Sequence, residues 1–118
     1  YPEDHFYLLS VNPVYCTLRY RGNTVTNSKI IRFNTTLRKL VKKSGYKNVT
    51  YVDTYKNVFQ KNGWVHKKSA YRYALKYRKM NVRHMSESSS YQLHYTDTVD
   101  KKLFKYVNNF ILNDMAQN

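Results

Sequence analysis

Cysteine is nearly absent from this sequence. Cys16 is the single cysteine among 118 residues, so the chain can form neither an intrachain disulfide nor a thiolate metal cluster. The four histidines lie far apart, without the spacing that places two of them on one helical turn: His5, His66, His84 and His94. Their separation argues against a zinc site, and we expect no cofactor.

Proline, glycine and long apolar runs are also scarce. Two prolines and three glycines exclude collagenous and low-complexity classes. No apolar run of about 18 residues occurs, so we expect no membrane span. The opening "YPEDHFYLLS" lacks the basic region of a signal peptide, and the compartment stays open. Because 42% of the residues are hydrophobic and 16% aromatic, we expect a single folded domain over residues 1–118.

Acidic residues are few. Seven Asp and Glu stand against 21 Lys and Arg, which gives a formal charge of +14. Such a charge favours a polyanionic partner, for example nucleic acid or anionic lipid. A lysine-rich surface that is simply solvated has the same composition, so both interpretations stand.

The clearest pattern is a helix within residues 26–45, "TNSKIIRFNTTLRKLVKKSG". Asn27 or Ser28 can cap its start, Lys42 and Lys43 suit its last turn, and Gly45 suits its end. Apolar residues recur every three or four positions, on one predicted helical face: Ile30, Phe33, Leu37, Leu40 and Val41.

Two predicted strands flank this helix. Residues 5–14, "HFYLLSVNPV", form a short apolar run that favours a buried strand leading into a loop. Residues 47–55, "KNVTYVDTY", are rich in β-branched and aromatic residues and predict a strand ending near Asp53. The order strand, helix, strand predicts a right-handed βαβ unit with parallel strands.

The remaining segments are less regular. Residues 15–26 predict a loop or weak strand with a turn at Gly22 and Asn23, and residues 56–64 a short helix broken at Gly63. A final helix is predicted after Thr96 or Thr98, either of which can cap it, with acidic Asp97 and Asp100 near its start. Its apolar face consists of Val99, Leu103, Val107, Phe110 and Ile111.

Residues 64–90 differ in composition and form a basic, aromatic insertion. Trp64 and three tyrosines alternate with cations, a helix is predicted at about 69–80, and a serine-rich stretch follows. The cations that could track a polyanion through 67–83 are Lys67, Lys68, Arg72, Lys76, Arg78, Lys79 and Arg83.

Four segments in order carry a family resemblance: "SVNPV" (10–14), "TNSKIIRFNTTLRKL" (26–40), "NVTYVDTY" (48–55) and "LHYTDTVDKKLFKYVNNFI" (93–111). Together they resemble the C-terminal half of SGNH/GDSL-type hydrolases, with the strongest likeness to bacterial members. The resemblance implies a flavodoxin-like three-layer α/β fold with a parallel sheet, here an incomplete portion. It also implies an esterase acting on acylated carbohydrates or lipids, with secretion or a cell-surface location.

The resemblance assigns one catalytic residue. His94 matches the family's general base, which takes the proton of a serine nucleophile and returns it to the leaving group. The family's Gly-Asp-Ser block does not occur in these 118 residues, and Tyr91 and Gln92 occupy the motif's aspartate and glycine positions. Asp97 could orient His94 from the other side. We therefore expect the polypeptide to be inactive by itself.

Three other interpretations remain open. His94 could be a loop residue that packs on the final helix rather than a base. The chain could be a small cationic module that binds nucleic acid or another polyanion through 67–83. It could also be a non-catalytic interaction protein, because a strand at 5–14 with an unpaired edge would invite a second chain to complete the sheet.

Overall fold

The structure is a computed structural model that describes residues 4–15, 17–20, 22–65, 79–87 and 94–117. In chain order the elements are β1 (Phe6–Leu9), β2 (Thr17–Tyr20), β3 (Asn23–Thr26), α1 (Asn27–Ser44), β4 (Val49–Val52), the π-helical turn η1 (Tyr55–Gln60), the 3-10 turn η2 (Val82–His84) and α3 (Asp97–Gln117).

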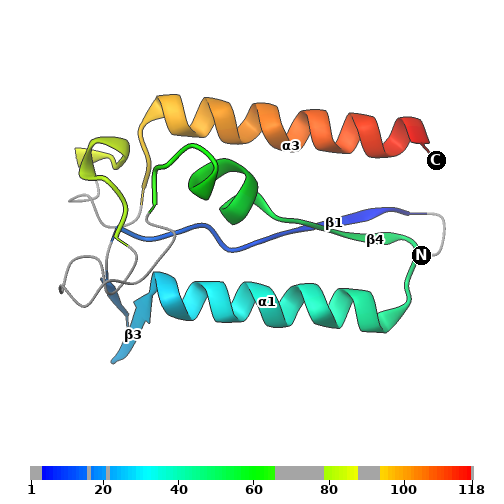
Figure 1. The fold of residues 1–118 in the computed structure, drawn as a ribbon, viewed down its shortest axis with the longest axis horizontal. Coiled ribbons are helices and arrows are strands. Elements are labelled where there is room, and N and C mark those ends of the chain that lie inside the picture. The colour runs from blue at the N-terminus through cyan, green and yellow to red at the C-terminus, as the bar shows by residue number, and fades with distance from the viewer. Residues whose placement is uncertain (1–3, 16, 21, 66–78, 88–93, 118) are drawn as a thin grey trace.

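A parallel pair of strands lies between two long helices. β1 and β4 run parallel, with Phe6 opposite Val49 and Leu9 opposite Val52. α1 and α3 flank this pair on opposite sides (Figure 1). The predicted strand–helix–strand unit with parallel pairing is confirmed, and the fold is mixed α/β around a two-stranded parallel sheet.

The first strand differs from its prediction. The expected buried strand over 5–14 is confined to Phe6–Leu9, and Phe6, Leu8 and Leu9 are all exposed. The reason is that, among the described residues, β1 pairs with β4 alone, so one side of the strand has nothing packed beside it.

The N-cap of helix α1 is Thr26, one residue before the first predicted cap. Thr26 has extended backbone angles, and its hydroxyl accepts a hydrogen bond from the Lys29 amide at 3.3 Å. The predicted caps Asn27 and Ser28 are therefore wrong, since both lie inside the helix. Gly45 ends it in the left-handed conformation at φ 71°, as predicted.

The apolar face of α1 is only partly covered. Ile30 is buried, whereas 56% of Phe33 and 59% of Leu40 are exposed. The five cations that follow the first turn are exposed, as their predicted face requires: Arg32, Arg38, Lys39, Lys42 and Lys43.

The strands β2 and β3 form an antiparallel pair. Thr17 lies opposite Thr26 and Tyr20 opposite Asn23, and Gly22 adopts a positive φ of 78°. The predicted turn is present at Gly22, but Asn23 is already the first residue of β3. The loop alternative is wrong for β2 and β3, because both are extended and paired.

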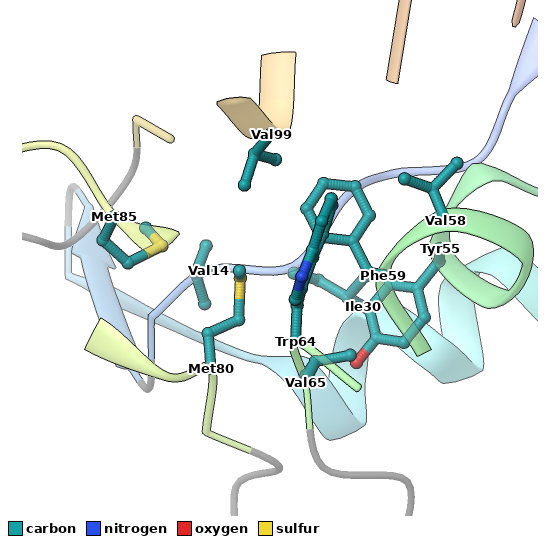
Figure 2. Close-up of a cluster of buried hydrophobic side chains, with 10 residues drawn as sticks. All are labelled: Val14, Ile30, Tyr55, Val58, Phe59, Trp64, Val65, Met80, Met85 and Val99. Atoms are coloured by element: carbon teal, nitrogen blue, oxygen red, sulfur yellow. The ribbon is translucent and has the colours of Figure 1, made fainter. Parts of the chain in front are cut away.

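The core lies at the carboxyl ends of the parallel strands rather than between strands and helices. Phe59 of η1, Trp64 and Val65 pack against Met80, Met85 and Val99 (Figure 2). Phe59 meets Trp64 edge-on, with 5.9 Å between ring centroids. The predicted short helix is present as η1, and Gly63 adopts φ 71° in the turn behind it.

The predicted helix at 69–80 lies mostly outside the described residues. Its last position is wrong, because Met80 pairs with Val65 in an antiparallel bridge. The Met80 amide also donates to the Tyr15 carbonyl at 2.7 Å, and the Asn81 amide to the Trp64 carbonyl at 3.0 Å. These bonds hold positions 65 and 80 side by side.

Helix α3 begins at Asp97, directly after Thr96, so the alternative cap Thr98 is wrong because it lies within the first turn. Its C-terminal part packs on β1: the Tyr7 hydroxyl donates to Asp114 Oδ2 at 2.7 Å, and the Tyr7 and Phe110 rings meet edge-on. Among the helices described, none is long and apolar enough to cross a membrane.

Candidate functional site

Two loops leave the carboxyl ends of β1 and β4 and are joined by buried hydroxyls. Thr54 Oγ1 donates to Asn12 Oδ1 at 2.6 Å and lies 2.9 Å from Ser10 Oγ. Ser10 Oγ also accepts the Tyr55 amide at 2.9 Å. Because the Thr54 proton goes to Asn12, the Ser10 hydroxyl donates to Thr54. Ser10 is thus fully engaged in holding the two loops together.

Two asparagines of α1 fix the rest of the loop after β1. The Asn34 side chain accepts the Val11 amide at 2.8 Å and donates to the Val11 carbonyl at 2.9 Å. Asn27 makes the same pair of bonds with Val14, at 2.8 and 2.7 Å. Each carboxamide therefore acts as one residue of a β-ladder, and residues 11–14 are bound to α1 like a strand.

The segment around His94 is attached to this platform. The His94 carbonyl accepts the Ser86 amide at 2.7 Å, and the Thr96 amide donates to the His84 carbonyl at 3.0 Å. Met85 and Tyr95 form an antiparallel bridge between these bonds. The main chain from His94 to Thr96 is therefore held in place.

Tyr95 anchors the same segment to the loop after β1. Its hydroxyl donates to the Pro13 carbonyl at 2.5 Å, and its ring lies 4.9 Å from that of Phe59. Burial raises the pKa of Tyr95 well above its ordinary value, and the nearby Asp100 carboxylate raises it further. The hydroxyl stays protonated and remains a donor throughout the physiological range.

His94 itself is exposed, on the chain that leads into α3. The residues that follow it, Tyr95, Thr96 and Asp97, line an open hollow of about 710 Å³ together with Glu87, and His94 is not part of that lining. Val82, Arg83, Met85 and Ser86 complete the lining. Tyr91 and Gln92, which take the places of the motif residues, lie outside the described part of the chain.

The other described histidines have structural contacts. The ring of His84 lies 5.2 Å from Trp64, and burial, with the charges of Arg83 and Lys102, lowers its pKa. His5 Nε2 lies 2.7 Å from Thr50 Oγ1 and 3.6 Å from Asp114 Oδ2. Over the ranges that the structure describes, no three His, Cys, Asp or Glu side chains gather as metal ligands.

A second hollow is basic. It has a volume of about 500 Å³ between η1 and α3, with Lys61, Lys102 and Lys105 around it. Asn57 Nδ2 donates to the Tyr106 hydroxyl at its wall, at 2.9 Å. Lys102 Nζ also lies 5.5 Å from the Trp64 ring centroid, next to the start of the basic insertion. Of the insertion's predicted cations, Lys79 and Arg83 lie in the described residues, and Lys79 Nζ is 4.5 Å from the Tyr15 ring centroid.

Sequence reasoning singled out His94 as a candidate but did not find the groups that position its segment. Asn27 and Asn34 are seven residues apart, two helical turns, on the face that carries Ile30. A buried carboxamide requires a hydrogen-bond partner, so the two asparagines on this apolar face could have been predicted to bind a neighbouring segment. Comparison of this chain with protein-family models, curated proteins and solved structures finds no match.

Proposed function

We propose that this chain is the histidine-bearing portion of an SGNH-type ester hydrolase, with His94 as general base and with the flavodoxin-like three-layer sheet that this family has. The observation that carries the proposal is the place of His94. It is exposed, main-chain hydrogen bonds with Ser86 and His84 fix the segment from residue 94 to 96, and the residues that follow it line an open hollow.

The position suits catalysis for a general reason. In open α/β sheets ligands bind outside the carboxyl ends of the strands. Tyr95 ties the His94 segment to Pro13, which belongs to the loop that leaves the carboxyl end of β1. A base must be held in position and must also reach its substrate, and an exposed ring on an anchored segment meets both conditions.

The proposed chemistry is acyl transfer. His94 takes a proton from a serine hydroxyl as that oxygen attacks the ester carbonyl, and then returns the proton to the leaving alcohol. Asp97 is the proposed orienting carboxylate, since it is the first residue of α3 and follows His94 by three positions. The serine is supplied from a Gly-Asp-Ser block outside these residues, and the substrate is an acylated carbohydrate or lipid.

The test expresses the complete reading frame that encodes these residues and measures hydrolysis of p-nitrophenyl acetate. His94→Ala is expected to lower kcat/KM by about 10³-fold, the range for loss of a catalytic acid–base. His5→Ala is the matched control, because His5 precedes β1 at the opposite end of the sheet and contacts Thr50. Wild-type turnover in His94→Ala, with unchanged circular dichroism, contradicts the assignment.

A second candidate function is polyanion binding, and the lysine-lined hollow between η1 and α3 favours it. Lys61, Lys102 and Lys105 line one hollow of about 500 Å³, and Lys102 Nζ lies 5.5 Å from the ring centroid of Trp64, which precedes the 67–83 cation series in the sequence. Phosphates bound there would displace counterions, so affinity would fall steeply with salt.

A labelled single-stranded oligonucleotide, titrated at several salt concentrations, tests this candidate. Replacing Lys61, Lys102 and Lys105 by Gln is expected to reduce the slope of log affinity against log salt by about two to three. The matched control replaces three exposed lysines of α1 by Gln: Lys39, Lys42 and Lys43. Equal slopes in the two triple variants would mean that charge alone, and not the hollow, governs binding.

A further inference from the structure

The open edge of β1 has main-chain groups directed away from β4. The Phe6 amide donates to the Asn48 carbonyl at 2.8 Å, and the Ser10 amide to the Val52 carbonyl at 2.9 Å. In a parallel ladder alternate residues bond to the same neighbour, so Tyr7 and Leu9 direct their N–H and C=O groups to the opposite edge. An edge of this kind is a template for another strand.

Apolar side chains of α1 extend past this edge. Val11, which continues the chain after β1, lines a hollow of about 290 Å³ together with Val25, Ile30 and Phe33. Phe33 and Leu40 are seven residues apart, so they lie on one line along the helix. Phe33 shares this hollow with Val11, so the exposed apolar row of α1 begins next to the chain that continues from β1.

Helix α3 contributes a matching row on the other side of the sheet. Phe104 is 72% and Met115 is 62% exposed, and both share one stripe with the half-buried Val107 and Ile111. Tyr106 points toward η1, where it accepts a bond from Asn57. Because successive helical residues are about 100° apart, Phe104 lies about 160° around the helix from Tyr106, on the flank away from η1.

Parallel strands occur almost entirely inside α/β proteins with helices on both faces of the sheet. Here α1 and α3 lie on opposite sides of the strand pair (Figure 1), and both helices carry exposed apolar side chains. A further strand beside β1 would lie between these two helices and could cover part of this apolar surface.

The positive charge of α1 next to this edge indicates which kind of segment can bind there. Helix α1 carries six Lys and Arg and no Asp or Glu: Lys29, Arg32, Arg38, Lys39, Lys42 and Lys43. Lys29 lines the apolar hollow beside Phe33. A second copy of a chain with charge +14 would bring two such cationic surfaces together, whereas an acidic segment would be attracted.

We propose that the open-edge surface, formed by β1, Val11, Phe33, Leu40 and Phe104, binds a β-strand of another polypeptide in parallel to β1. The strand is apolar on both faces and is flanked by acidic residues. The inference rests on the fold and charge of this chain and is independent of the hydrolase proposal, because its readout is binding and not turnover.

A synthetic peptide tests the proposal with the purified chain. The probe has a centre of alternating Val and Ile with two acidic residues at each end, and the control peptide has the same centre with lysines at the ends. Fluorescence anisotropy is expected to show at least about ten-fold tighter binding of the acidic peptide. Phe33→Asp is expected to weaken that binding at least about ten-fold, since it places a charge in the groove.

Val82→Asp is the matched control, because Val82 is also an exposed apolar residue and lies on η2. It is expected to leave the affinity within about two-fold of wild type. Equal affinity for the two peptides, or no binding of either, overturns the proposal. Sedimentation of the chain as a dimer that Phe33→Asp dissociates also overturns it, because the occupant is then a second copy.

Discussion

Asn27 and Val14 exchange two hydrogen bonds inside the protein, with the carboxamide of Asn27 in the role of a second main chain. Asn27 is fully buried and is also the first residue of α1. The side chain of Asn27 therefore joins the helix start, the loop after β1 and the core around Val14. Seven residues later, Asn34 makes the same pair of hydrogen bonds with Val11.

Asn27→Ala is expected to destabilise the protein by about 2–4 kcal/mol, because it leaves a buried N–H and a buried C=O of Val14 without partners. Urea unfolding followed by circular dichroism measures the loss. Asn108→Ala, an exposed asparagine of α3, is expected to change the unfolding free energy by less than about 0.5 kcal/mol. A similar loss in both variants would contradict the special role of Asn27.

Thr54→Val is expected to cost about 2–3 kcal/mol although the two side chains have the same shape. Thr54 is fully buried, and its hydroxyl links Ser10 to Asn12 across the ends of β1 and β4. Thermal unfolding of Thr54→Val and of the exposed control Thr98→Val separates this effect from any general preference for valine. The link is unimportant if the two midpoints shift equally.

Tyr95 makes the folded protein less stable as the pH rises above about 10. Burial raises its pKa in the folded state above the unfolded value of about 10, so the folded state keeps a proton that the unfolded state loses. The contribution of Tyr95 to the free energy of unfolding is complete below about pH 10. It declines by up to about 1.4 kcal/mol per pH unit as the pH rises toward the pKa of Tyr95 in the folded state.

Tyr95→Phe removes this dependence together with the hydrogen bond to Pro13. The variant is expected to be about 1 kcal/mol less stable at pH 7, and to lose less stability than the wild type between pH 10 and 11. Urea titrations at pH 7, 9, 10 and 11 test this, with the other tyrosines common to both proteins. Parallel stability curves for the two proteins would show that Tyr95 is not the group responsible.

Gly45→Ala is expected to destabilise the protein by about 1 kcal/mol through its backbone alone. The glycine has φ 71°, and a methyl group built on it meets no atom within 4 Å. Gly45→Asn is expected to cost less, since asparagine tolerates the left-handed region. Differential scanning calorimetry should rank the melting temperatures in the order Gly, Asn, Ala; any other order contradicts the backbone explanation.

The long elements were predictable from the sequence because local signals agree there. The apolar repeat of α1, its terminal Gly45 and the acidic start of α3 at Asp97 each mark a helix by a mechanism that needs no tertiary context. The parallel pairing of β1 with β4 followed from the helix between them, because a connection of that length returns the chain in the same direction.

Burial was not predictable in the same way. An apolar pattern shows which face of Phe33 or Leu8 seeks cover, but not whether this chain provides the cover, and here both remain exposed. The cap of α1 was misplaced because Thr26, Asn27 and Ser28 are all competent caps, and the choice depended on Asn27 being needed by Val14. Tyr95 was missed because its partner, Pro13, is 82 residues away in sequence.

The antiparallel bridge between Val65 and Met80 has a consequence for how this protein can change over generations. Because the two ends of the intervening segment are fixed next to each other, its length can change without moving the residues that the bridge holds. Shortening the intervening stretch to a tight Asn-Gly reversal, or exchanging it for a foreign segment, should therefore leave Trp64 and Met85 where they are. We therefore expect insertions, deletions and replacements between Val65 and Met80 to be tolerated better than changes in the core.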